Sequence, residues 1–206
     1  MKKTVLITLG VACAVALFHQ GLTAEVGIKA GVSFSKYQWP TPVPIGFEWQ
    51  YLPFAAGGLY IEAGRGILSI QPGVFFTRMG GRYAVEGDSL EFRFDYVQVP
   101  VLLKMNILPS GSVCPFFAFG GYGAYLVKAQ GVLVLDAERQ VENIIEEYNT
   151  FDAGLVFAAG LDFQFARTTV SVECRYAHGL VEALKDPAGG ESMKHRSIMA
   201  LVGIGF

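Results

Sequence analysis

Beyond its first two dozen residues, the sequence has no apolar run long enough for a transmembrane helix. Charges and glycines interrupt every candidate stretch, although 52% of the 206 residues are hydrophobic and only 17% are charged. This composition is more hydrophobic than that of an ordinary soluble domain. A chain that is oily but has no spanning helix fits a membrane as a closed antiparallel barrel, because neighbouring strands satisfy one another's backbone groups.

The sequence also lacks the usual signatures of catalysis and of nucleic-acid binding. No cluster of Lys and Arg occurs, and the net charge of −2 argues against a nucleic-acid partner. No phosphate loop, nucleophile elbow, CxxC pair or zinc-ligand spacing follows residue 24. We therefore expect no enzymatic activity, no cofactor and no metal ion.

Cysteine is scarce. After the N-terminal segment only Cys114 and Cys174 remain, in two predicted strands that have a third between them. Two strand spacings amount to roughly 9–10 Å, which is too far for a disulfide. We expect both thiols to be free and buried in the wall of the barrel.

Residues 1–24 have the pattern of a secretory signal peptide. Lys2 and Lys3 precede an apolar core over 5–18, and small residues ending at Ala24 form the exit. The apolar run is too short for a membrane anchor and no stop-transfer charges follow it. The predicted organisation is a signal peptide over 1–24 and a barrel domain over 25–206.

The stretch 148–166 alternates strictly between two kinds of residue. One set is oily: Phe151, Ala153, Leu155, Phe157, Ala159, Leu161, Phe163 and Phe165. The other set is small or polar: Asp152, Gly154, Val156, Ala158, Gly160, Asp162 and Gln164. Side chains of a strand alternate between its faces, so this pattern predicts a strand with lipid on one side and a filled polar lumen on the other.

Similar segments predict an all-β fold, an eight-stranded antiparallel transmembrane β-barrel with up-and-down meander topology. The expected strands cover 26–37, 52–63, 67–78, 89–107, 113–127, 148–166, 168–180 and 196–206. Connections after the second, fourth and sixth strands are short, whereas those over 38–50, 82–89, 128–147 and 181–195 are long. Outer-membrane barrels sort their loops in this way, with short periplasmic turns. A lipocalin-like soluble barrel is the alternative, with its oily face inward.

Nine polar side chains are predicted to face the lumen. They are Lys29, Glu62, Gln71, Gln98, Lys104, Asp152, Asp162, Glu173 and Arg175. Because both signs of charge occur and buried charges need partners, we interpret them as a structural ion-pair network that fills the barrel. A proton relay or a narrow ion path along these groups is the alternative. The facing of the strand over 113–127 stays ambiguous.

Two prolines fall inside predicted strands. Pro72 and Pro100 have no N–H for a ladder hydrogen bond, and a closed barrel has no edge strand to receive them. We expect β-bulges or locally unpaired positions there.

Two histidines flank the last long connection. His178 and His195, with Asp186 or Glu191, have a spacing too loose to predict a metal site, so we interpret them as solvent-exposed rim residues. His195 and Ser197 resemble the His-x-Ser pair of outer-membrane lipid A deacylases, in which histidine activates serine beside the bilayer. Residues at i and i+2 share a strand face, but the rest of that family's pattern is missing.

Several longer segments resemble the PorT-type, or porin-family, outer-membrane β-barrels. They are GIKAGVSFSKY, DYVQVPVLLK, PFFAFGGYGAYL, FDAGLVFAAGLDF, VECRYAHGL and the closing VGIGF. The resemblance covers the whole chain after residue 24 and implies location in the cell outer membrane. The terminal Phe206 is similar to the C-terminal aromatic residue that the barrel-assembly machinery reads.

The expected function is a structural or surface-interaction role, carried by the extracellular loops of a barrel without an open pore. Eight strands leave an interior that side chains just fill, which disfavours passage of solutes. The expected partners are outer-membrane lipid, the barrel-assembly machinery and an extracellular ligand or protein, with the chain itself a monomer. A small channel or PorT-like secretion component is the first alternative, and a lipid-modifying enzyme is the second.

Overall fold

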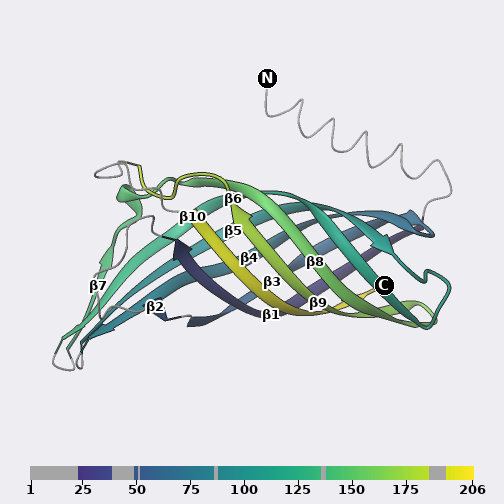
Figure 1. Ribbon diagram of the computed structural model, residues 1–206, viewed down its shortest axis with the longest axis horizontal. Coiled ribbons are helices and arrows are strands. Elements are labelled where there is room, and N and C mark those ends of the chain that lie inside the picture. Colours follow the sequence, from purple (N-terminus) through teal and green to yellow (C-terminus); the bar gives the residue numbers. More distant parts are fainter. Residues whose placement is uncertain (1–22, 39–48, 51, 86–87, 136–137, 186–193) are drawn as a thin grey trace, which may run out of the picture.

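The computed structural model describes residues 23–38, 49–50, 52–85, 88–135, 138–185 and 194–206. Eight long strands form a closed antiparallel barrel, which confirms the predicted fold (Figure 1). They are β1 (Thr23–Gln38), β3 (Leu52–Arg65), β4 (Leu68–Val85), β5 (Asp88–Asn106), β6 (Val113–Leu135), β8 (Phe151–Phe165), β9 (Thr168–Gly179) and β10 (Lys194–Gly205). The barrel closes where β1 pairs with β10 over twelve residues, from Gly27 opposite Gly205 to Gln38 opposite Lys194.

Hydrophobic and polar residues alternate along the strands, so the hydrophobic side chains lie on the outside of the barrel and the polar ones on the inside. Along β8 the burial alternates as the sequence predicts, with Phe151, Leu155 and Phe157 exposed and Asp152 and Val156 buried. Exposed Val, Ile, Leu and Phe side chains on the outer face match the lipid-facing band of an outer-membrane barrel. No helix among the described residues is long and apolar enough to cross a membrane.

The structure resolves the facing of β6. Cys114, Phe116 and Tyr122 are buried inside, whereas Phe117 and Phe119 are exposed. Further along, the β5–β6 register shifts: Tyr96 pairs with Leu126, but Asp95 pairs with Lys128. Val127 is therefore the extra residue of a β-bulge, and a strict alternation over the whole strand is broken there.

Both prolines lie at gaps in the ladders. The β3–β4 pairing passes from Tyr60–Gly73 to Ala63–Ile70 and omits Pro72. The β4–β5 pairing passes from Pro72–Val101 to Phe75–Gln98 and omits Pro100. The register is the same on either side of each gap, so the prediction of locally unpaired positions is confirmed and no bulge accompanies either proline.

Two predicted loops are strands in the structure. β4 continues to Val85 and β5 begins at Asp88, and the two strands pair up to Val85 opposite Asp88. β6 continues to Leu135 and pairs with the short strand β7 (Glu138–Asn143), which is followed by a 3-10 helix, η1 (Ile145–Glu147). Residues 128–135 therefore prolong β6 beyond its expected end at residue 127. Polar composition favours a loop locally, but a neighbouring strand satisfies the backbone and keeps the segment extended.

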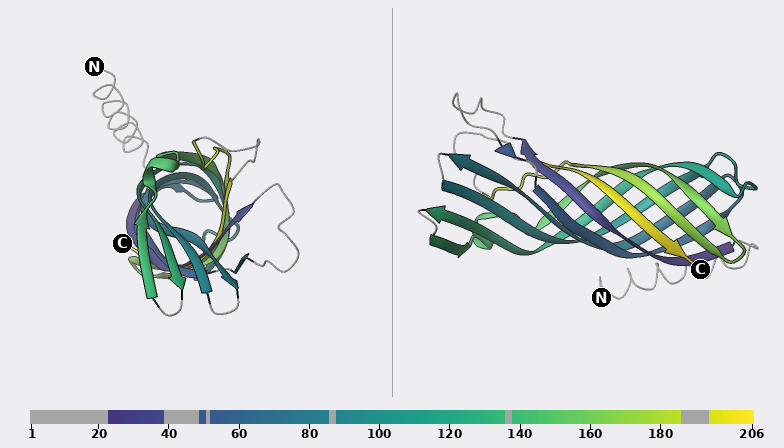
Figure 2. Two further views of the ribbon diagram at one scale, coloured as in Figure 1. Left: turned by 90° about the vertical axis from the view of Figure 1, so that its left-hand side faces the viewer. Right: turned by 90° about the horizontal axis from the view of Figure 1, so that it is seen from below.

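These extensions form a sheet that projects from one end of the barrel, where β7 and the ends of β4 to β6 lie in Figure 1 and Figure 2. We call it the projecting sheet: β2 (Trp49–Gln50), residues 80–85 of β4, 88–95 of β5, 128–135 of β6, and β7. β2 pairs with β4, so Trp49 belongs to a strand; residues 39–48, with Trp39 and Phe47, lie outside the described residues.

The opposite end carries the short turns and both ends of the described chain. The turns span 66–67, 107–112 and 166–167, with Gly66 and Ala166 at positive φ. Phe206 exchanges backbone hydrogen bonds with Val26, at 2.9 and 3.1 Å. In an outer-membrane barrel the short turns are periplasmic, so we expect the projecting sheet at the extracellular end and name the two ends of the barrel accordingly. Most of the expected signal peptide lies outside the described residues, although Thr23 and Ala24 already pair with β3.

Candidate functional site

All nine predicted lumen residues lie on the inner face of the barrel. Eight are buried, with exposed fractions of 4% or less, and Glu62 is half-buried beside the periplasmic opening. They come from β1, β3, β4, β5, β8 and β9, so six of the eight strands contribute to the interior.

Seven of the nine form one continuous chain of hydrogen bonds, which we call the lumen network. Arg175 Nε donates to Glu173 Oε1 at 2.6 Å, and Lys29 Nζ donates to Glu173 Oε2 at 2.5 Å. Lys29 also donates to Gln71 at 2.9 Å, and Gln71 in turn donates to Glu62 at 2.8 Å.

Lys104 completes the lumen network on its periplasmic side. Its Nζ lies 2.7 Å from Glu62 Oε2 and 2.6 Å from Asp162 Oδ2. Three cations therefore meet three carboxylates across the lumen. A buried ion costs several kcal/mol to desolvate, so this charge balance keeps the filled interior stable in the absence of bulk water.

Aromatic rings enclose the cations of the lumen network. Lys104 Nζ is 4.5 Å from the centroid of the Phe116 ring, and Lys29 Nζ is 4.7 Å from that of Tyr60. Arg175 Cζ is 4.6 Å from the Phe75 ring centroid. A cation is attracted to the face of a ring, so these contacts add to the ion pairs and fill the space between them. The sequence pattern did not single out these rings, although parity with Glu62 and Gln71 places Tyr60 and Phe75 inside.

The other two predicted residues lie apart from the lumen network. Asp152 accepts hydrogen bonds from the Tyr122 hydroxyl at 2.9 Å and from the Ala153 amide at 2.8 Å. Neither side-chain polar atom of Gln98 has a partner among the described residues. Sequence reasoning missed Glu25, which accepts from Tyr60 and Thr169 at 2.9 and 2.6 Å.

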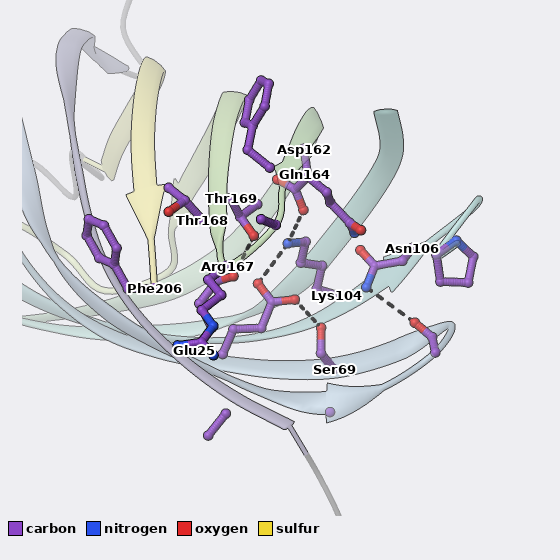
Figure 3. Close-up of a pocket in the computed structure, with 17 residues that line it drawn as sticks. Glu25, Ser69, Lys104, Asn106, Asp162, Gln164, Arg167, Thr168, Thr169 and Phe206 are labelled. Carbon is purple, nitrogen blue, oxygen red and sulfur yellow. Dashed lines mark hydrogen bonds and ion pairs between the residues drawn. The ribbon is translucent and has the colours of Figure 1, made fainter. Parts of the chain in front are cut away.

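A vestibule of about 640 Å³ opens at the short-turn end (Figure 3). Arg167 and Phe206 line it near the turns and the C-terminus, and Lys104 and Asp162 line it from within. It therefore reaches from the periplasmic opening to the ion pairs of Lys104. Its polar lining contrasts with the apolar packing at the other end of the barrel.

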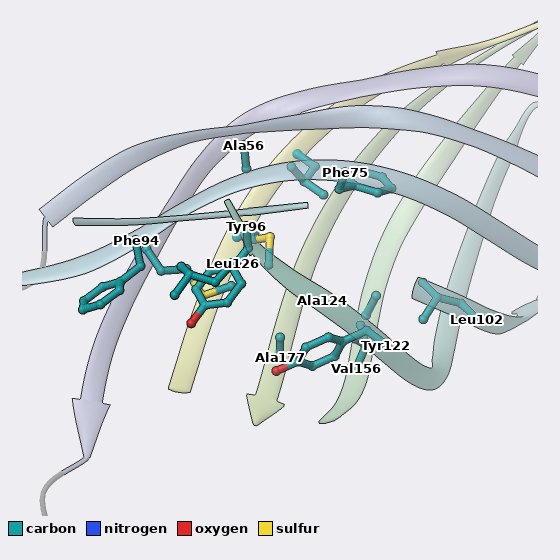
Figure 4. Close-up of a cluster of buried hydrophobic side chains, with 14 of the residues drawn as sticks. Ala56, Phe75, Phe94, Tyr96, Leu102, Tyr122, Ala124, Leu126, Val156 and Ala177 are labelled. Carbon is teal, nitrogen blue, oxygen red and sulfur yellow. The ribbon is translucent and has the colours of Figure 1, made fainter. Parts of the chain in front are cut away.

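The extracellular end is covered by residues 144–149, which follow β7, and by residues 183–185, which follow β9; we call these two segments the cap. Tyr148 packs on Phe94 with ring centroids 4.7 Å apart and pairs through its backbone with Leu184. Asn149 donates its amide N–H to Ala183 O at 2.8 Å. Burial raises the pKa of the Tyr148 phenol to about 12. Below the cap, Phe94 and Tyr96 belong to a cluster of buried hydrophobic side chains (Figure 4).

The expectation that His195 is a solvent-exposed rim residue is wrong. His195 is 3% exposed, and its Nε2 lies 2.9 Å from the Tyr96 hydroxyl. His195 is the second residue of β10, and its side chain points into the barrel, where its ring lies 6.2 Å from that of Phe94 beneath the cap. His178 is half-buried beside Tyr176, with 3.3 Å between the hydroxyl and Nδ1.

The comparison with lipid A deacylases finds no support in this geometry. Ser197 is 2% exposed and shares the inner face with His195, so both point into the barrel and away from the bilayer. Within the described part of the chain no group of three His, Cys, Asp or Glu side chains is placed to hold a metal ion. Asp186 and Glu191 lie outside the described residues.

Both described cysteines are free, as predicted. Cys114 is buried on the lumen face, but the expected burial of Cys174 is wrong: its side chain is exposed because it shares the outer face of β9 with Val172. β8 lies between their strands, which keeps the two thiols apart.

Comparisons with known proteins agree with the barrel. OprG from Pseudomonas aeruginosa is similar in fold, with a TM-score of 0.51 at 10% identity over 89% of this chain and 96% of that chain. Neisserial surface protein A gives 0.49 at 10% identity over 91% and 100%, and Ail of Yersinia pestis gives 0.45 at 14% over 89% and 99%. No curated protein matches.

A family model described as "Outer membrane protein beta-barrel domain" matches residues 18–184, which is most of the chain. Together with the closed eight-stranded barrel and its apolar outer face, this match places the protein in the outer membrane. The chain belongs to the outer-membrane β-barrel domain family.

Proposed function

We propose that this barrel conducts no solute and acts through its projecting sheet at the cell surface. One observation carries the proposal: the lumen is closed twice. The lumen network spans the interior with buried ion pairs, and the cap packs Tyr148 on Phe94 above it. A solute would have to break paired charges and displace packed rings to pass.

The projecting sheet has the shape and chemistry of a contact surface. At the base of the sheet, Arg78 of β4 binds Asp95 of β5 through two hydrogen bonds of 2.5 and 2.9 Å, and within the sheet Arg93 binds Glu91 of its own strand through two of 2.6 and 3.1 Å. The bidentate pair of Arg78 and Asp95 links β4 to β5. The edge strand β7 exposes Gln140, Glu142 and Asn143 together with Val141, so the sheet offers a mainly polar strand edge to an extracellular ligand or protein.

Conductance in planar bilayers tests whether the barrel is closed. Purified monomer should insert without steady current steps. Steady open steps would overturn the proposal and favour the small-channel or PorT-like transport role. If the variant Lys104→Met then lost these current steps, the ion path would run through the lumen.

The position of the sheet at the cell surface has its own test. A membrane-impermeant maleimide added to intact cells should label Gln140→Cys, which is exposed on β7. It should leave the matched variant Arg167→Cys, in a short turn, unlabelled until the outer membrane is opened. Labelling of the turn and protection of β7 would mean the opposite orientation and would remove the surface role.

The route to the membrane belongs to the same proposal. Residues 1–24 act as a signal peptide, and the barrel-assembly machinery reads the C-terminal Phe206, which is 69% exposed and extends beyond the last strand. The chain then functions as a monomer, because its ring of strands is closed without a second copy.

A further inference from the structure

A group of polar side chains in the middle of the barrel has no hydrogen-bond partner within the part of the chain that the structure describes. Arg175 uses Nε for Glu173, but its terminal nitrogens Nη1 and Nη2 have no acceptor. The side-chain amide atoms of Gln98 and the hydroxyls of Ser33, Thr77 and Ser197 also have no hydrogen-bond partner among the described residues. All five of these unpartnered side chains are at most 2% exposed. A buried polar group without a partner costs about 1–3 kcal/mol, so an occupant that satisfies several of them would be bound.

One wall of this region is formed by β9, β10 and β1. Arg175 pairs with Met199 on β10, and Met199 pairs with Ser33 on β1, all three facing inward. Ser197 lies two residues from Met199 on the same face of β10. Paired residues of adjacent strands lie about 5 Å apart, so Arg175, Ser33 and Ser197 border one interior space.

The facing wall is formed by β4 and β5. Arg175 reaches across the lumen, and its Cζ is 4.6 Å from the Phe75 ring centroid. Phe75 pairs with Gln98 on β5, and Thr77 follows two residues later on the inner face of β4. The guanidinium therefore contacts the wall that carries Gln98, the cross-strand partner of Phe75, and Thr77. We call this set of five residues the Arg175 pocket.

The unpartnered atoms of the Arg175 pocket are mostly donors. The two guanidinium nitrogens and the Gln98 amide nitrogen can only donate, and the three hydroxyls can donate or accept. Gln98 Oε1 is the one atom that can only accept. A matching occupant must accept several hydrogen bonds and donate few. An anion meets this requirement better than an amine, a metal cation or a polyol does.

The local charge favours an anion as well. Lys29 and Arg175 share the single carboxylate of Glu173, so this part of the lumen has one more positive charge than negative. The compensating excess of carboxylate, Glu62 and Asp162 around Lys104, lies beside the periplasmic vestibule. We propose that the Arg175 pocket binds one small monovalent inorganic anion, of the size of chloride, inside the barrel.

Halide dependence of unfolding tests the proposal on the full-length barrel folded in detergent. Chloride is titrated at constant ionic strength against bulky gluconate, and the loss of the heat-modifiable folded band is followed with temperature. The melting temperature should rise by several degrees and then saturate, because an anion that binds only the folded barrel stabilises it. Crystals soaked in bromide should show an anomalous peak between the Arg175 guanidinium and the Gln98 amide. Equal melting temperatures in the two salts, with no such peak, would overturn the proposal.

The variant Gln98→Glu gives a second, independent test of the anion site. The change keeps the shape of the side chain and places a carboxylate beside Arg175, where it takes the part of the anion. The variant should melt in gluconate at least as high as the natural protein does in chloride, and chloride should no longer shift it. The matched variant Gln164→Glu changes an exposed vestibule residue and should keep the chloride shift. An undiminished shift in Gln98→Glu would exclude this pocket; if Gln98→Glu does not fold, the titration and the bromide peak of the natural protein decide.

Discussion

Lys29 and Glu173, 144 residues apart in the chain, meet inside the barrel with 2.5 Å between Nζ and Oε2, although β10 separates their strands. Each side chain is 1% exposed. Glu173 also accepts from Arg175, so one carboxylate holds two cations together. Removing it leaves two buried positive charges without their counter-charge.

Glu173→Gln should therefore destabilise the barrel strongly. The loss of one partner from a buried ion pair costs about 3–5 kcal/mol, and the amide keeps the shape of the side chain. The free energy of unfolding from urea titration in detergent measures the effect. Adding Arg175→Gln should recover part of the loss, since the two residues belong to one network.

The control for this prediction is Glu182→Gln. Glu182 lies 4.0 Å from Lys194, and the two side chains are 39% and 40% exposed. An exposed pair contributes about 0–1 kcal/mol, so this variant should stay near the natural protein. Equal effects of the two variants would show that the lumen pair does not stabilise the barrel.

Lysine substitutions on β9 distinguish its two faces. Val172 is 48% exposed on the outer face, whereas the adjacent Ser171 is buried and pairs with Asp162. A lysine facing the middle of the bilayer costs about 2–4 kcal/mol, but a lysine at position 171 can find a carboxylate. Val172→Lys should lower the heat-modifiable folded fraction more than Ser171→Lys. The reverse ranking would invert the facing of this strand and the set of lumen residues with it.

Gly31→Ala should weaken closure of the barrel between β1 and β10. A methyl group at this position would overlap the backbone carbonyl oxygen of Ala200. Overpacking of this kind costs about 1–3 kcal/mol, and a rigid backbone cannot rotate away. Gly121→Ala is the matched change, because its new methyl would meet only Gly154 O at 3.6 Å. Refolding yield into lipid vesicles should fall for the first variant and stay unchanged for the second.

Tyr148→Ala should loosen the cap without opening the barrel wall. Tyr148 is 6% exposed and packs on Phe94, and truncation of a buried aromatic side chain costs about 3–5 kcal/mol. Limited proteolysis of the folded protein should then cut between residues 143 and 151 at a lower protease concentration. Val141→Ala, on the exposed edge strand, should show the natural cleavage pattern. Unchanged protection in Tyr148→Ala would mean that the cap is held by its backbone hydrogen bonds alone.

The sequence by itself determined the fold class and the facing of most strands. Asp152 and Asp162 fall on the inner face of β8 because side chains alternate along any strand, whatever its neighbours are. The oily opposite face, exposed in the structure, then required lipid. Parity was ambiguous only on β6, where glycines and aromatic residues occupy both faces and a bulge at Val127 shifts the pattern.

Only the tertiary structure decided which inner residues meet. Contact between Lys29 and Glu173 depends on strand register and tilt, which hydrogen bonds between distant segments set and which no local pattern encodes. The burial of His195 under the cap and the extension of β4, β5 and β6 into the projecting sheet have the same origin. A side chain's direction is a local property of the backbone, whereas its neighbours across the lumen are a property of the closed barrel.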